Sequence, residues 1–185
     1  TPSHQVALIP TAEPVVSKTT ALPALLHPAR NTLVFAQTAL DIALGLRNLR
    51  LEGFWLLTLG AAQQVKGQFS EALISYQRSA TLHRRLADRS REALAWQGVG
   101  EVYRRLGRHA EAADFYRQAA STHRDLGDEW HQALALDGLG SAVLDENSEE
   151  ARRHWAQALR LLTDFGDSRA VAARENIERR LTETS

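Results

Sequence analysis

Apolar residues recur along this chain at the three- and four-residue spacing of an amphipathic helix, and the whole arrangement returns after 40 residues. Each copy has an apolar residue followed by glycine, then an alanine, an aromatic residue four positions later and a small residue. The three copies are Leu59-Gly60, Ala72, Tyr76 and Ser79; Val99-Gly100, Ala112, Tyr116 and Ala119; and Leu139-Gly140, Ala151, Trp155 and Ala158. A fixed period of this length predicts a solenoid, in which each unit buries its apolar face against its neighbours.

Each unit is expected to form two helices, A and B, joined by a tight turn. Helix A is predicted at about residues 50–66, 89–106 and 129–145, and helix B at about residues 69–86, 109–126 and 148–165. Short polar residues that can cap the next helix stand at the junctions, at Asn48, Asp88, Asp128 and Asp167. Gly127 and Gly166 precede two of these caps and are predicted to take the left-handed conformation that ends a helix.

The ends of the chain depart from the repeat. Residues 1–30 contain all five prolines and are predicted to form an arm or linker, because proline interrupts helices. This arm either lies on the solenoid surface as a tether or packs its apolar run, Val6–Ile9, in a groove of this chain or of a neighbour. The chain begins with Thr1 and has no methionine, so we expect it to be a piece of a longer protein.

The solenoid is predicted over residues 31–182. It starts with a degenerate half-repeat, a helix B without its helix A, which caps the first full repeat. Three repeats and a solvated capping helix follow, the latter with apolar positions at Val171, Ala172 and Ile177. The five segments are residues 31–48, about 49–88, 89–128 and 129–166, and 167–182.

The repeat unit resembles the tetratricopeptide repeat. That family has tryptophan, Leu-Gly and tyrosine on helix A, and alanine, an aromatic residue and alanine on helix B. The second unit meets this pattern with Trp96, Val99, Gly100, Tyr103, Ala112, Tyr116 and Ala119. The third unit departs from it, because its turn, Asp145–Ser148, lacks glycine. The resemblance implies an all-α, right-handed α-solenoid that binds a protein or peptide and catalyses no reaction.

The repeat is also longer than the usual 34 residues of this family. Its 40-residue period and its Leu126-Gly127-Asp128 junction resemble the repeats of large bacterial transcriptional regulators of SARP type and of STAND-type signalling ATPases. This resemblance implies the sensor or regulatory arm of a larger bacterial transcriptional regulator, whose other domains are then candidate partners. A stand-alone adaptor or scaffold protein and a groove for a small peptide ligand are the alternatives.

The positions of helix A that face away from helix B line the concave groove in this family and are therefore the candidate partner-binding residues. They are Phe54, Leu57, Gln64, Leu94, Gln97, Glu101, Arg104, Leu134, Asp137, Ser141 and Leu144. Phe54, Leu94 and Leu134 form an apolar ladder, which either contacts a bound helix or peptide or packs between adjacent A helices. Trp130 replaces a polar residue of the other units and is either a contact anchor or a staple for the preceding loop.

Candidate catalytic chemistry is sparse. The seven histidines form no tight ligand pair such as H-E-x-x-H, and His83 and His123 recur at equivalent positions as scaffold residues do, so no metal or cofactor is expected. Gly98-x-Gly100 lies inside a predicted helix and no nucleophile motif is present, so no enzyme is expected. Cysteine is absent, which excludes disulfides and thiolate sites and agrees with a cytoplasmic protein.

The charges do not indicate nucleic acid. Twenty-two basic and 22 acidic residues cancel, and acidic residues interrupt the arginine clusters at residues 84–91 and 104–108. Within these clusters, Arg84 and Asp88 have the spacing of a salt bridge. No apolar run reaches the roughly 18 residues of a membrane span, and the start of the chain does not resemble a secretory signal. We expect a cytoplasmic module that binds neither nucleic acid nor a membrane.

Overall fold

The computed structural model describes residues 28–184, which form eight α-helices and no strand. The helices are α1 (Pro28–Gly45), α2 (Leu49–Val65), α3 (Phe69–Arg85), α4 (Arg89–Arg105), α5 (His109–Asp125), α6 (Glu129–Val143), α7 (Ser148–Leu162) and α8 (Ser168–Glu183). The prediction of an all-α repeat solenoid is confirmed. Most of the predicted arm, including Val6–Ile9, lies outside the described residues, and its last three residues begin α1.

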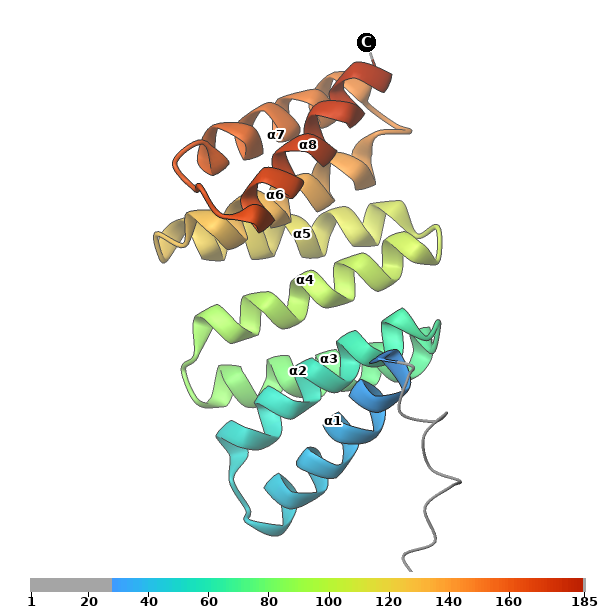
Figure 1. Cartoon of the computed structure of the whole chain (residues 1–185), viewed down its shortest axis with the longest axis vertical. Helices are drawn as coiled ribbons and strands as arrows, with labels where there is room; N and C mark the ends of the chain where they lie inside the picture. The colour runs from blue at the N-terminus through green and yellow to red at the C-terminus, as the bar shows by residue number, and fades with distance from the viewer. Residues whose placement is uncertain (1–27, 185) are drawn as a thin grey trace, which may run out of the picture.

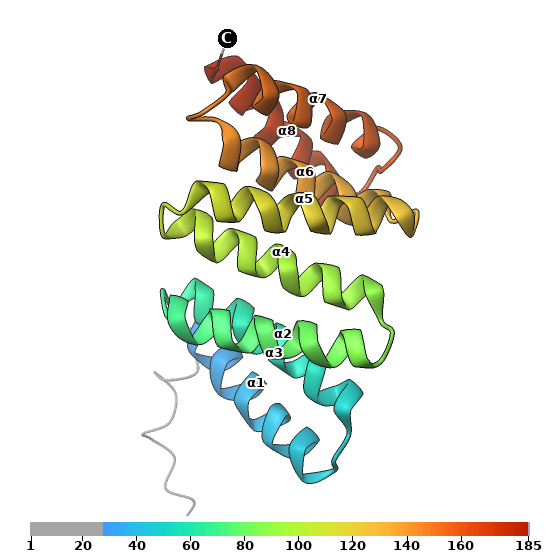
Figure 2. The same ribbon diagram turned by 180° about the vertical axis from the view of Figure 1, so that it is seen from behind.

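Successive helices pack as hairpins that stack along the long axis of the molecule (Figures 1 and 2). The hairpins pair α2 with α3, α4 with α5 and α6 with α7, and the B helix of each hairpin packs on the A helix of the next. The A helices α2, α4 and α6 also contact one another, so together they form one face of the stack. No helix within residues 28–184 is long and apolar enough to cross a membrane.

Each of the four predicted caps is present. Asn48 accepts hydrogen bonds from the backbone N–H groups of Arg50 and Leu51, both at 3.1 Å. The other caps accept from the residue three positions later: Asp88 from Arg91 at 3.2 Å, Asp128 from His131 at 3.1 Å and Asp167 from Ala170 at 2.9 Å. Each of these bonds satisfies a backbone donor that the start of a helix leaves free.

The five turns from α1 to α6 each contain a residue with positive φ. Gly127 has this conformation, as predicted, with φ of 69°. The prediction for Gly166 is wrong, because α7 already ends at Leu162 and the chain leaves it through a turn in which the Phe165 N–H bonds to the Leu162 carbonyl at 3.2 Å. At two junctions an L-residue takes the place of glycine: Arg47 has φ of 51° and Ala87 has φ of 55°.

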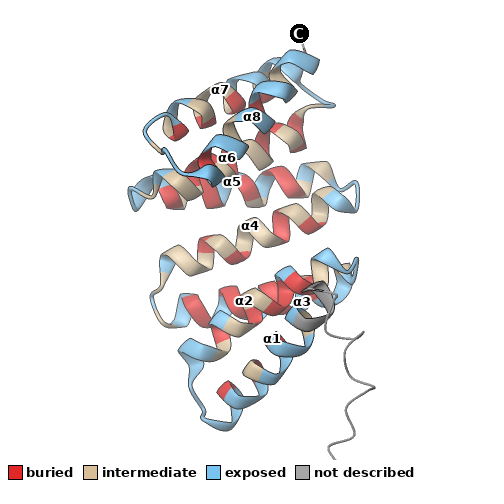
Figure 3. Cartoon of the chain, in the orientation of Figure 1, coloured by how far each residue is buried: buried red, intermediate tan, exposed pale blue. Residues whose placement is uncertain are grey.

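Buried residues lie along the middle of the stacked helices (Figure 3). Among them are the aromatic residues Tyr76, Tyr116 and Trp155, one from each of α3, α5 and α7. Tyr76 lies between Gly60 of its own unit and Gly98 of the next. A Cβ atom added to Gly60 would lie 2.9 Å from the Tyr76 ring, and one added to Gly98 would lie only 2.5 Å away. Tyr116 lies in the same way between Gly100, at 3.3 Å, and Gly138, at 2.3 Å. The closest approach is therefore between units.

Where the aromatic residue is absent, the facing glycine is absent too. In α1 the repeat position of Tyr76 is occupied by Ala36, and in α2 the repeat position of Gly98 is occupied by Thr58. The smaller side chain on helix B thus accompanies a larger one on the following helix A. The larger Thr58 side chain compensates in part for the volume that an aromatic ring would occupy between the two helices.

Helix α8 covers the C-terminal end of the stack. Ala170 and Ile177 are buried against the preceding helices, whereas Val171 and Ala172, two of the three predicted apolar positions, are exposed. Ala170 and Ile177 are seven residues apart and so lie on one face of the helix, with Val171 and Ala172 off that face. The Arg174 side chain donates to the carbonyl groups of Leu162 and Phe165, at 2.6 Å each, where α7 ends.

At the N-terminal end, no described helix covers α1 in this way. Phe35 and Ile42 of α1 are 65% and 59% exposed, whereas the residues at their repeat positions in α3, Ser75 and Leu82, are 5% and 8% exposed. The difference arises because α2 covers this face of α3, and no described helix covers the same face of α1. Trp55 of α2 meets only the edge of this face, with its ring centroid 5.6 Å from that of Phe35.

Replacing Ala87 by glycine should stabilise the chain. An L-residue in the left-handed region is strained by roughly 1–2 kcal/mol, and glycine removes this strain at the cost of a more flexible unfolded chain. We expect a net gain of about 0.5–1 kcal/mol in the free energy of unfolding measured with urea. The control Ala172→Gly, at an exposed site within α8, should instead lose up to about 1 kcal/mol. Equal losses in the two variants would contradict the strained turn.

The contact between Tyr76 and Gly98 should appear as coupling between substitutions. Gly98→Thr overpacks the ring and should cost about 1–3 kcal/mol, and Tyr76→Ala should cost about 3–5 kcal/mol through the cavity it leaves. The double variant reproduces the Ala36 and Thr58 pair of the first junction, so its loss should be smaller than the sum by at least about 1 kcal/mol. Urea unfolding of the three variants measures this difference. If the losses of the two single variants simply add in the double variant, the contact between Tyr76 and Gly98 does not limit the spacing of the helices.

Candidate binding groove

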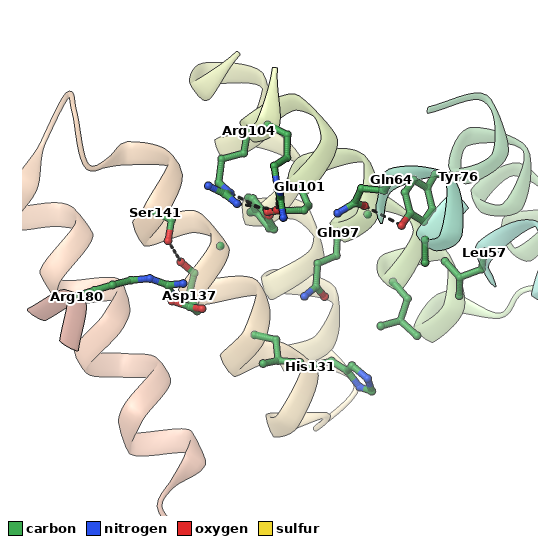
Figure 4. Close-up of a pocket in the computed structure, with 17 residues that line it drawn as sticks. Leu57, Gln64, Tyr76, Gln97, Glu101, Arg104, His131, Asp137, Ser141 and Arg180 are labelled. Atoms are coloured by element: carbon green, nitrogen blue, oxygen red, sulfur yellow. Dashed lines mark hydrogen bonds and ion pairs between the residues drawn. The ribbon is translucent and has the colours of Figure 1, made fainter. Parts of the chain in front are cut away.

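A groove with a volume of about 630 Å³ runs across the face formed by the A helices (Figure 4). Its lining comes mainly from α2, α4 and α6, with one residue each from α3, α5 and α8. The lining residues are Leu57, Ala61, Gln64, Tyr76, Leu94, Gln97, Gly98, Glu101, Arg104, Arg105, Tyr116, His131, Leu134, Asp137, Gly138, Ser141 and Arg180.

Most of the residues that the sequence assigns to the groove lie together there. Nine of the eleven, all except Phe54 and Leu144, belong to the lining. Phe54 instead packs against Trp55, with ring centroids 5.0 Å apart, and Leu144 packs against the core at the end of α6. The apolar part of the groove is thus formed by Leu57, Leu94 and Leu134, which are all half-buried.

The lining residues that were not anticipated from the sequence include Tyr76, Tyr116, His131 and Arg180. The tyrosine rings are core residues, as predicted, but their hydroxyl groups reach the groove residues Gln64 and Glu101. Arg180 comes from the capping helix and forms an ion pair with Asp137 (Figure 4). The position of the tyrosines on the repeat offered a signal, whereas Arg180 lies outside the repeats and offered none.

Glu101 is the most strongly held charge in the groove. Arg104 donates two hydrogen bonds to its carboxylate, each at 2.7 Å, Arg105 donates one at 2.9 Å and the Tyr116 hydroxyl one at 2.8 Å. Burial alone would raise the pKa of Glu101, but these hydrogen bonds outweigh it and hold the pKa at about 2. The same burial, together with the charge of Glu101, raises the pKa of Tyr116. The tyrosine therefore stays protonated and donates to the carboxylate.

The middle of the groove carries amide groups. Gln64 accepts a hydrogen bond from the Tyr76 hydroxyl at 3.0 Å. Gln97 lies on the next A helix, α4, four residues before Glu101 (Figure 4). The Oε1 atom of Gln97 is buried and has no hydrogen-bond partner among residues 28–184. An unpaired buried acceptor costs about 1–3 kcal/mol. Gln97 is thus suited to accept a hydrogen bond from a bound group.

The polar groups of the lining serve binding better than catalysis. The Ser141 hydroxyl donates to the Asp137 backbone carbonyl at 2.9 Å, so its proton is directed at a backbone group instead of a basic side chain. Glu101 is engaged by two arginines and a tyrosine. A general base must be within hydrogen-bond reach of the proton that it removes, and neither carboxylate of the lining has that relation to Ser141.

Trp130 lies away from the groove. Its ring centroid is 5.7 Å from that of Phe165, and the guanidinium carbon of Arg169 lies 5.3 Å from the Trp130 ring centroid. Both partners belong to the connection between α7 and α8 and the start of α8. In this structure Trp130 joins the start of α6 to that connection.

Comparison with known proteins agrees with this arrangement of helices. Residues 51–125 match the tetratricopeptide repeat family. The matched residues lie within α2–α5, the part of the stack in which Tyr76 is held between Gly60 and Gly98. No curated protein is significantly similar to the chain in sequence.

Two solved structures resemble the chain over most of its length. BtubC (BKLC) from P. vanneervenii superimposes with a TM-score of 0.67 and 15% sequence identity, over 84% of this chain and 72% of that chain. A putative kinesin light chain of Podosopora anserina, with nearly identical TPR-like repeats, superimposes with a TM-score of 0.53 and 15% identity, over 86% of this chain and 94% of that chain. At this level of identity the likeness shows the tetratricopeptide-type fold and nothing of the partner.

The low pKa of Glu101 predicts a pH dependence of stability. Because the folded-state pKa lies below the ordinary value of 4.5, the ionised carboxylate stabilises the fold above about pH 4.5, and this contribution is lost as the pH falls toward about 2. The stability difference between the wild-type chain and Glu101→Gln should therefore shrink over that interval in urea unfolding. Glu178→Gln, at an exposed site of α8, should change little at any pH. A constant difference for Glu101→Gln would contradict the ionised network.

Proposed function

We propose that this chain is a noncatalytic module that binds a segment of a partner protein in the groove. Tetratricopeptide repeats generally bind proteins or peptides. The observation that carries the proposal is the strip formed by Leu57, Leu94 and Leu134, which is left half-buried along a concave surface. Covering such a strip with apolar side chains of a partner is favourable by roughly 25 cal/mol per Å² of apolar surface removed from water.

The polar groups of the groove indicate what kind of segment fits. The charges are already paired within the chain, Glu101 with Arg104 and Arg105, and Asp137 with Arg180. A strongly charged ligand would have to break these pairs, whereas Gln97 can accept a hydrogen bond from a backbone N–H. We infer a segment with apolar side chains and few charges, bound as an amphipathic helix or an extended strand.

The arginine clusters support a protein partner over nucleic acid. Arg84 pairs with Glu92 at 2.7 Å, Arg91 with Asp88 at 2.6 Å and Arg108 with Glu111 at 2.6 Å. The pair of Arg84 with Asp88 expected from their spacing is therefore wrong, because each finds a closer partner on α4. Phosphate binding requires basic side chains that are free to neutralise phosphates, and these arginines are held by carboxylates.

We further propose that the module is the regulatory arm of a larger bacterial transcriptional regulator in the cytoplasm. The support is the resemblance of the 40-residue period and of the Leu126-Gly127-Asp128 junction. In such an arm, a partner that binds the groove more tightly in one arrangement of the parent protein shifts the balance between two arrangements. A stand-alone adaptor would show the same groove without this coupling, and a short free peptide would fit its volume of about 630 Å³.

Groove variants test whether the strip binds the partner. The chain would be immobilised and exposed to lysate of the source cells, and retained proteins and peptides would be identified by mass spectrometry. Leu94→Glu with Leu134→Glu places two charges on the apolar strip, so a partner held by the groove should be lost at least tenfold. Circular dichroism checks that the variant is folded.

The matched control places the same two charges outside the groove. Ile74 and Leu106 are exposed apolar residues that do not belong to the lining, so Ile74→Glu with Leu106→Glu should retain the partner. Loss from the groove variant alone supports the proposal, and equal retention by the two variants refutes it. Cross-linking of the full-length parent protein then separates an arm, whose groove links to other domains of the same chain, from an adaptor, whose groove links to a second protein.

A further inference from the structure

Two histidines and a carboxylate meet at the junction of α5 and α6, beside the groove. The Nδ1 atom of His131 lies 2.7 Å from Oδ2 of Asp128, and the Nδ1 atom of His123 lies 3.6 Å from the same oxygen. The two imidazole rings are stacked with centroids 5.3 Å apart. One ligand atom from each residue can be chosen so that all three lie within 4.8 Å of one another. The cluster thus converges on a single point.

His123 is the unusual member of this cluster. Its side chain is fully buried, and neither ring nitrogen has a hydrogen-bond partner in the described part of the chain. A buried polar group without a partner costs free energy that a ligand at that position recovers. Asp128 and His131 are partly exposed, with 26% and 32% of their side-chain surface accessible, so the point on which the three converge can be reached from solvent.

The preceding repeat contains a comparison for this cluster. His83 and Asp88 stand at the repeat positions of His123 and Asp128, with Nδ1 of His83 3.7 Å from Oδ2 of Asp88. There the third position is Arg91, whose guanidinium group pairs with that oxygen at 2.6 Å. The buried histidine is therefore part of the repeat, and the exchange of Arg91 for His131 is not. One junction contains a permanent cation beside its carboxylate, and the other replaces it with an imidazole.

We infer that His123, Asp128 and His131 form a binding site for a divalent transition-metal ion of the zinc type. Two imidazole nitrogens and one carboxylate oxygen are a common set of protein ligands for zinc, with bonds of about 2.0–2.2 Å. Around a tetrahedral ion such ligands stand roughly 3.3 Å apart, so Asp128 and His131 need to separate by a fraction of an ångström. The fourth position would be open to water or to a ligand.

The arrangement also leaves the helix cap in place. Oδ1 of Asp128 accepts from the backbone N–H of His131 at 3.1 Å, whereas Oδ2 faces the two rings. A metal ion bound by Oδ2 of Asp128 and Nδ1 of His131 would replace the proton between these two atoms. The cap bond to Oδ1 would remain. This site is hard to predict from the sequence, because its three residues stand on two helices and the turn between them. The one available signal was the departure from the repeat at His131.

Calorimetric titration of the untagged 185-residue chain with Zn²⁺, together with the visible absorption of Co²⁺ added in its place, tests the site. We expect one equivalent of metal and the absorption of a four-coordinate Co²⁺ ion with imidazole ligands. His131→Arg reproduces the preceding junction and should retain the fold. Because it removes a direct ligand, it should weaken binding by more than the roughly 10- to 100-fold that changes to neighbouring groups cause.

Two further variants use other junctions of the same chain as templates. Asp128→Asn copies the cap Asn48, so it should keep the helix start and weaken metal binding. Arg91→His gives the preceding junction the same three residue types and should raise the stoichiometry to two. The inference is overturned if the wild-type chain binds Zn²⁺ no more tightly than His131→Arg does, or if Arg91→His still binds no more metal than the wild type.

Discussion

The stack depends on a tyrosine ring held between two glycines of successive A helices. The glycine of the following unit has no room for a side chain. A Cβ atom added to Gly98 would lie 2.5 Å from the Tyr76 ring, and one added to Gly138 would lie 2.3 Å from the Tyr116 ring. This contact sets how closely one hairpin can approach the next, and the approach is repeated at each junction. The first junction, with Ala36 and Thr58, satisfies the same constraint by exchanging the sizes of the two partners.

The same tyrosines connect the core to the groove. Their rings are buried between helices, while their hydroxyl groups bond to Gln64 and Glu101 on the concave face. Glu101 also accepts hydrogen bonds from Arg104 and Arg105. Tyr116 therefore positions this charged group through its hydroxyl and sets the helix spacing through its ring. The groove therefore inherits the rigidity of the core beneath it, which reduces the ordering that a partner must impose on binding.

Much of this arrangement follows from the sequence, because a period of 40 residues places equivalent positions on equivalent surfaces. The caps and most of the groove were predictable in this way. Gly98 and Gly138 share the same period as Gly100 and Gly140, yet their role was missed, because their contact lies between units and the pattern was interpreted within one unit. Arg180, Phe54 and the exposed face of α8 could not be placed, since they depend on how nonrepeating ends pack against the stack.

The two ends of the stack give it a direction. At α8, Arg174 donates to the carbonyl groups of Leu162 and Phe165, and most exposed residues of the helix are polar or charged, with Val171 and Ala172 as the exposed apolar ones. At α1, Phe35 and Ile42 lie where the next unit presents residues covered by its own helix A. Within residues 28–184 the two ends therefore differ in what they offer to an added repeat: α1 presents Phe35 and Ile42, two large apolar residues, whereas α8 presents a mainly charged surface.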